Sequence, residues 1–141
     1  MLNELRLRDH SMEPPIETTA YPVFVQSVDA DGNSVGGLRH PLLDAALATH
    51  VGWSLRATGY GEGDLFTIQG SMIPFAATEA ERLRAGDPRP SIAARYASRE
   101  AWAEKLTDAC ELLVADRLLL AEDADRLSAA ALESWDVYQV L

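Results

Sequence analysis

The chain has 141 residues, of which 48% are hydrophobic, and its formal net charge at pH 7 is −10. This length and composition suffice for one globular domain with a buried core. The negative charge excludes nucleic acid and anionic membranes as expected partners, because both would repel the chain. No apolar stretch approaches the roughly 18 residues of a transmembrane helix, and the first ten residues lack the apolar centre of a signal peptide. We therefore expect a cytoplasmic protein.

Residues 1–20 are predicted to form a flexible tail or linker. Glu13-Pro14-Pro15 and Thr18-Thr19 are typical of extended chain without regular pairing. A single domain is then expected over residues 21–141. It consists of a hairpin and loop region at 21–76 and a helical region at 77–141.

The hairpin and loop region begins with a run of β-branched and aromatic residues from Tyr21 to Val28, which predicts a strand. Asp29 to Asn33 has the composition of a tight turn, so residues Ser34 to Arg39 are expected to return as a second strand. Residues 41–76 are predicted to be mostly irregular. They include two helical turns near Leu42 to Leu47 and a short strand at Leu65 to Ile68.

The helical region shows three N-terminal signals. Thr78-Glu79-Ala80-Glu81 is a capping box for a short helix that Gly86 ends, and Ser91 and Ser98 are further N-caps. The helix after Ser98 is expected to reach about Leu119, and a last helix begins near Glu122. A short connection between them implies an antiparallel helix hairpin.

The apolar stripes of these two helices are spaced three or four residues apart, and they comprise Trp102, Leu106, Ala109, Cys110 and Leu113 on the first helix and Ala124, Leu127, Ala131, Trp135 and Tyr138 on the second. The predicted fold class is therefore α+β. An N-terminal β-hairpin and an irregular segment precede a C-terminal helical region with an antiparallel helix hairpin.

The one catalytic signature is Gly32-Asn33-Ser34-Val35-Gly36, which matches the G-x-S-x-G nucleophile elbow of serine hydrolases. An elbow needs a helix directly after the serine, whereas here the chain continues Gly37-Leu38-Arg39-His40-Pro41. Asp44 and His50 follow in Ser–Asp–His order, but too close together for a hydrolase sheet. We interpret the string as a hairpin turn and assign no catalytic residue. Ser34, His40 and His50 remain the candidates to be tested.

No metal or cofactor site is expected. Asp29 to Asn33 resembles a calcium loop, but its glycine is fourth rather than sixth, and position twelve is His40 rather than glutamate. No two of His10, His40 and His50 have the i, i+4 spacing that places metal ligands on one helix face, and no cysteine cluster accompanies them. The lone Cys110 is interpreted as a small core residue.

An acidic stripe is expected on the helix after Ser98, opposite its apolar face. It comprises Glu100, Glu104, Asp108 and Glu111. We interpret it as a solvated face, with a partner-binding edge as the alternative.

Several segments together resemble the C-terminal region of bacterial "alpha/beta hydrolase domain" proteins, over about residues 21–135. The matching stretches include 21–33, 37–39, 47–49, 52–56, 70–76, 80–82, 86–91 and 95–96, for example Gly52-Trp53-Ser54-Leu55-Arg56 and Gly86-Asp87-Pro88-Arg89-Pro90-Ser91. The resemblance implies an esterase-like parent whose nucleophile and catalytic histidine lie upstream of the matched region.

Three functions follow as hypotheses. The chain is the non-nucleophile C-terminal part of a hydrolase that packs on a hydrolase core or partner chain. Alternatively, it is a small homo-oligomeric interaction module built on the helix hairpin. In the third hypothesis it is a minimal serine esterase that uses Ser34.

Overall fold

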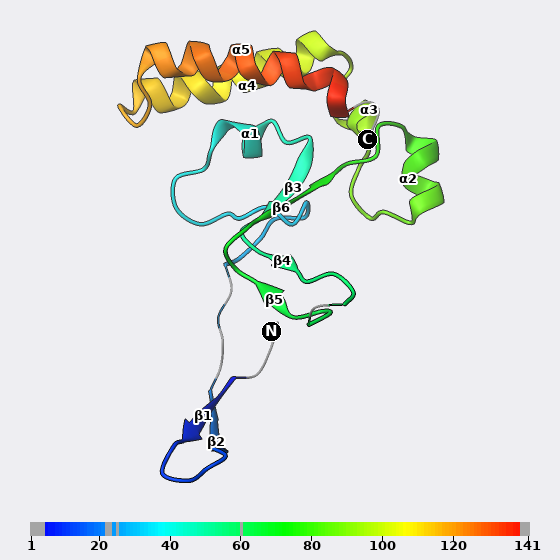
Figure 1. Cartoon of the computed structure of the whole chain (residues 1–141). Helices are drawn as coiled ribbons and strands as arrows, with labels where there is room; N and C mark the ends of the chain where they lie inside the picture. The colour runs from blue at the N-terminus through cyan, green and yellow to red at the C-terminus, as the bar shows by residue number, and fades with distance from the viewer. Residues whose placement is uncertain (1–4, 22–23, 25, 60, 139–141) are drawn as a thin grey trace.

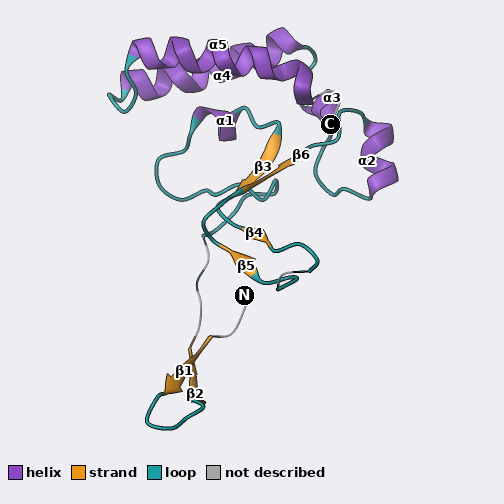
Figure 2. Ribbon diagram, in the orientation of Figure 1, coloured by secondary structure: helices purple, strands orange, loops and turns teal. Residues whose placement is uncertain are grey.

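A computed structural model describes residues 5–21, 24, 26–59 and 61–138. A helical layer lies over a group of short strands and loops, and a separate two-stranded ribbon lies apart from both (Figures 1 and 2). In chain order the elements are β1 Leu5–Asp9, β2 Ile16–Tyr21, α1 Pro41–Asp44, β3 Ala48–Val51, β4 Ser54–Leu55, β5 Leu65–Phe66, β6 Ser71–Pro74, α2 Glu79–Ala85, α3 Ile92–Arg95, α4 Arg99–Ala115 and α5 Ala121–Tyr138.

The described strands form three antiparallel pairs, β1–β2, β3–β6 and β4–β5. Helices α4 and α5 run side by side as the long upper layer, and the short helices α1, α2 and α3 connect this layer to the strands (Figure 2). The predicted α+β class, with strand pairs first and a helix hairpin last, is confirmed.

The segment expected to be an unpaired tail instead contains the β1–β2 ribbon. Arg8 faces Glu17 in the strand register, and their side chains form an exposed ion pair at 3.8 Å. The Thr18 hydroxyl also donates a hydrogen bond to the Leu7 carbonyl, at 3.1 Å. The prolines at 14 and 15 lie in the connecting turn, so they interrupt no ladder hydrogen bond.

Of the hairpin predicted over residues 21–39, the described residues form the turn and little regular pairing. Residues 22, 23 and 25 lie outside the described part of the chain, and the described residues up to 39 hold one isolated bridge, between Val28 and Ser34. The turn itself is closed by a hydrogen bond of 2.8 Å from the Asp29 N–H to the Asn33 carbonyl. Gly32 takes the expected positive φ, at 79°.

A buried amide attaches this turn to strand β3. The Asn33 side chain is fully buried; its Nδ2 donates to the Ala48 carbonyl at 3.0 Å, and its Oδ1 accepts from the His50 N–H at 2.8 Å. The amide thus satisfies two backbone groups at the edge of β3, as a neighbouring strand would. This pairing explains why no second regular strand is needed here.

An ion pair fixes the same turn to the helical region. Asp31 accepts hydrogen bonds from the guanidinium of Arg95 on α3, including one of 2.7 Å from Nη1, and both side chains are mostly buried. The Arg95 guanidinium also lies 4.0 Å from the centroid of the buried Phe75 ring. Arg95 on α3 therefore contacts both the turn and the residue that follows β6.

The predicted helix caps are confirmed. Thr78 and Glu81 form the capping box of α2, Gly86 ends that helix with φ 65°, and the hydroxyls of Ser91 and Ser98 cap α3 and α4. Helix α4 ends at Ala115 rather than near Leu119, because the chain reverses after Asp116 through Arg117, whose φ is 62°.

The segment near Leu42 to Leu47 forms one helical turn rather than two. Helix α1 ends at Asp44, and the next two carbonyls turn toward the helical layer. Trp102 Nε1 donates to the Ala45 carbonyl at 2.9 Å, and the Tyr96 hydroxyl donates to the Ala46 carbonyl at 3.0 Å. These bonds hold the segment out of a helix and lead it into β3.

The main core lies between this segment and the helix hairpin. Trp102 contacts Trp135 with ring centroids 4.9 Å apart and planes tilted by 38°, and Tyr96 meets Trp135 edge-on at 6.5 Å. Both predicted stripes contribute, since the buried residues of α4 and α5 are Trp102, Leu106, Ala109, Cys110, Ala131 and Trp135.

Replacing the buried amide tests its role directly. We expect Asn33→Ala to lower the free energy of unfolding by about 2–4 kcal/mol, because two backbone groups of β3 lose their partners. Urea denaturation followed by tryptophan fluorescence measures this change. Ser34→Ala, one position away, is the matched control and should change stability by less than about 0.5 kcal/mol. Equal losses in the two variants would contradict this account.

Candidate functional site

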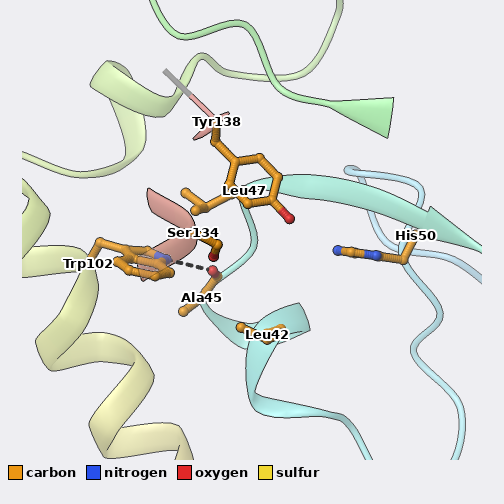
Figure 3. Close-up of a pocket in the computed structure, with 7 residues that line it drawn as sticks. All are labelled: Leu42, Ala45, Leu47, His50, Trp102, Ser134 and Tyr138. Carbon is orange, nitrogen blue, oxygen red and sulfur yellow. Dashed lines mark hydrogen bonds between the residues drawn. The ribbon is translucent and has the colours of Figure 1, made fainter. Parts of the chain in front are cut away.

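A small cavity lies where α1 and β3 meet the helix hairpin (Figure 3). Its volume is about 30 Å³, and its lining comprises Leu42, Ala45, Leu47, His50, Trp102, Ser134 and Tyr138. A space of this size holds about one water molecule. It is therefore too small to receive an ester substrate.

His50 extends from β3 toward this cavity (Figure 3). Its backbone N–H is held by Asn33, so the position of the residue is set by the buried amide. Burial lowers the pKa of the imidazole below its usual value of 6.5, and the nearby His40 lowers that pKa further. Both effects favour the neutral ring.

The hydroxyl groups of the cavity are already engaged. Ser134 Oγ donates to the Ala131 carbonyl of its own helix at 2.7 Å, and the Tyr138 hydroxyl donates to the sulfur of Met72 at 3.0 Å. Burial raises the pKa of Tyr138, which keeps the phenol protonated. Ser134 and Tyr138 lie four residues apart on one face of α5, but only Tyr138 was predicted as part of the buried stripe.

The three candidates from the sequence do not line one site. Ser34 lies at the bridge to Val28, and its Oγ accepts a hydrogen bond of 3.4 Å from the Gly36 N–H. His40 caps α1, where its Nδ1 accepts from the Leu42 N–H at 3.2 Å. Of the three, only His50 lines the cavity. No helix follows Ser34 directly, so the strand–turn–helix context of a nucleophile elbow is absent.

The acidic residues around Ser34 serve in ion pairs. Asp29 pairs with Arg39 at 2.6 Å, and Arg39 also binds Asp44 at 2.7 Å. Burial alone would raise the pKa of Asp29, but hydrogen bonds from Arg39 and from two backbone N–H groups lower it overall. Asp44, the apparent middle member of a triad, is thus bound to an arginine instead of a histidine.

The predicted core position of Cys110 is confirmed. Cys110 is buried, and Ser128 Oγ donates to its sulfur at 3.9 Å. Within the described ranges no three His, Cys, Asp or Glu side chains gather closely enough to bind a metal ion. None of the helices in those ranges has the length and apolar character needed to cross a membrane.

The burial of His50 has a consequence for stability against pH. Because its pKa is lower in the folded chain, the unfolded chain binds a proton more readily below about pH 6.5. The stability present above that pH is therefore lost as the pH falls through the folded pKa. We expect the free energy of unfolding to decrease between pH 7 and 5.5, and His50→Gln to flatten this slope. His10→Gln, in the exposed turn of the ribbon, should retain the wild-type slope; a slope unaffected by His50→Gln contradicts the assignment.

Comparison with known proteins places the chain in one family. The family model described as "Alpha/beta hydrolase domain" matches residues 8–129, which is most of the chain. No curated protein and no solved structure gives a match. The match runs from the end of β1 through α4 into α5, and it includes every cavity-lining residue except Ser134 and Tyr138. The chain belongs to the alpha/beta hydrolase domain family.

Proposed function

We propose that this chain is the C-terminal, non-nucleophile part of an alpha/beta-hydrolase-like protein. In this proposal it has no catalytic activity alone and packs on a hydrolase core, carried by the same parent protein or by a companion chain. Family membership supports the hydrolase context. Ser34 and His40 do not line the cavity that His50 lines, and this separation supports a role for the chain other than catalysis.

The observation that carries the proposal is the exposure of large apolar side chains below the helical layer. Ile68, after β5, is 87% exposed, Phe24 is 90% exposed, and Leu55 on β4 is 58% exposed. Met72 and Ile73 on β6 are also exposed. Large exposed apolar side chains of this kind are candidates for a contact surface.

A hollow on the β4–β5 pair adds a place for a partner side chain. It has a volume of about 250 Å³ and is bordered by Leu55, Arg56 and Phe66. The Arg56 guanidinium lies 5.1 Å from the centroid of the Phe66 ring. An apolar hollow beside an arginine and an aromatic ring has the composition of a protein–protein contact.

The homo-oligomeric helix module receives less support. The apolar stripes of α4 and α5 are buried in the core of the chain itself, since Trp102 is 1% exposed and Trp135 is 9% exposed. Those residues cannot also form a subunit interface. In this proposal, the strand side of the molecule is the surface that the hydrolase core covers.

An esterase assay distinguishes a non-catalytic part of a hydrolase from a minimal esterase that uses Ser34. We expect wild-type protein and Ser34→Ala to hydrolyse p-nitrophenyl acetate at the same background rate, because among the described residues no histidine or carboxylate hydrogen-bonds to the Ser34 hydroxyl. The release of p-nitrophenol is measured at pH 7.5. Activity in the wild type that Ser34→Ala abolishes would establish a serine esterase and overturn the proposal.

The contact surface is tested by charge substitution. We expect wild-type protein to bind an apolar fluorescent dye, and the double variant Leu55→Glu, Ile68→Glu to lose most of that signal. Leu83→Glu with Val137→Glu is the matched control, since these residues are also exposed but lie on α2 and α5. The control should retain the dye signal.

Co-expression then identifies the partner. The second protein is a family member truncated before its counterpart of residues 8–129. We expect wild-type chain to co-purify with this core, and Leu55→Glu, Ile68→Glu to fail while the control succeeds. A soluble core that never co-purifies with the wild-type chain counts against the proposal.

A further inference from the structure

A second hollow lies between α4 and α5, in the half of the hairpin that carries their connection. Its volume is about 330 Å³. Val114, Ala115, Ala121 and Ala124 supply apolar walls, and Glu111 and Asp125 also line it, one from each helix. The small alanines leave the two helices without side chains that would fill the space between them. The result is an apolar groove with a carboxylate from each helix.

The two carboxylates at the groove are not neutralised within the described residues. Neither Glu111 nor Asp125 forms an ion pair there, whereas Arg126 is already paired with Glu122 and Asp123. Residues 99–138 contain ten acidic and four basic side chains, so this segment has a net charge of −6. The groove therefore lies in a negative field with few cations available to compensate it.

Apolar surface continues beside the groove into the connection between the helices. Leu118 and Leu120 are 55% and 63% exposed, and they directly precede α5. A partner that fills the groove can cover these leucines as well. The groove and this connection thus combine apolar side chains with two carboxylates, a composition suited to a specific protein contact.

We propose that this groove binds an amphipathic helix of another protein, with apolar side chains in the groove and Lys or Arg beside Glu111 and Asp125. A helix laid into an apolar groove between two helices is a recurrent mode of peptide recognition. The two carboxylates select a basic partner. A second copy is disfavoured, because two hairpins of like charge repel each other.

This proposal goes beyond the hydrolase scaffold and does not depend on it. The groove lies in the helical layer near the α4–α5 connection, whereas the β4–β5 surface lies on the strand side of the molecule (Figure 1). Each surface can be changed without altering the other. Failure of one proposal is therefore distinguishable from failure of the other.

The test uses three synthetic helical peptides of about 15 residues, a length at which an isolated helix is marginally stable. The first has leucines at positions i, i+3, i+4 and i+7 with lysines on the other face. The second replaces the lysines with glutamates, and the third replaces the leucines with alanines. Binding to the whole chain is measured by titration calorimetry at 0.15 M salt. We expect only the leucine–lysine peptide to bind.

Two charge-reversal variants locate the binding. The double variant Glu111→Lys, Asp125→Lys should lower the affinity for the leucine–lysine peptide about tenfold, because two charge attractions become repulsions. Glu133→Lys, Asp136→Lys makes the same change of net charge at the other end of α5 and should leave the affinity within about twofold. Equal weakening by both variants would show general attraction to an acidic protein and overturn the proposal.

A variant that fills the groove tests its apolar part. Ala115→Phe, at an exposed position, should reduce peptide binding about tenfold while circular dichroism and the unfolding midpoint stay unchanged. Absence of binding by any peptide overturns the proposal. A second copy as the occupant would also overturn it. In that case sedimentation equilibrium would show a concentration-dependent dimer that Glu111→Lys, Asp125→Lys changes, while this variant leaves peptide binding unaffected.

Discussion

The fold depends on a single buried amide, that of Asn33. Its two hydrogen bonds replace a missing strand at the edge of β3 and fix a turn that has no other regular pairing. Because one of these bonds is to the His50 backbone, the same amide sets where that ring enters the cavity. Asp31, two residues earlier, carries the link on to Arg95 and α3. A short polar turn thus joins the strand group to the helical layer.

Arginines provide much of the remaining connection between distant segments. Arg89 donates to the Ile73 and Pro74 carbonyls of β6 and to Thr49 on β3, and it is held in place by Asp87. Its guanidinium lies 5.0 Å from the centroid of the Phe75 ring, which the Arg95 guanidinium also contacts. A planar guanidinium suits this task because it can donate several hydrogen bonds while stacking on an aromatic ring. The polar residues that suggest chemistry in the sequence therefore serve mainly in structure.

The predictable parts of the molecule were those determined by neighbouring residues. The caps at Thr78, Ser91 and Ser98 and the turn at Gly32 depend on side chains within a few positions, and all were predicted correctly. The Asp31–Arg95 pair spans 64 residues, and no local pattern indicates it. Among the described residues, the expected return strand from Ser34 to Arg39 forms only the bridge to Val28, and the Asn33 side-chain amide bonds the edge of β3 instead.

The candidate site also has a part that neighbouring residues predicted and a part that depends on distant contacts. The flanks of Ser34 correctly predicted that no helix follows it, which argued against a nucleophile elbow. The cavity around His50 could not be predicted, because it requires β3 to meet the far end of α5. Ser134 in particular lies between residues of the apolar stripe, and its approach to the cavity follows from how the two helices cross. The ribbon was missed because its strands are short and its turn is rich in proline.

The ribbon affects how the size of this molecule is measured. A compact chain of 141 residues would have a radius of gyration of about 14 Å. In Figure 1 the β1–β2 ribbon extends away from the helical and strand layers, so the molecule is elongated. An elongated monomer elutes early in gel filtration and resembles a dimer of compact subunits. Small-angle scattering, which reports shape and mass together, distinguishes the two and also shows whether the ribbon folds back when a partner covers the strand side.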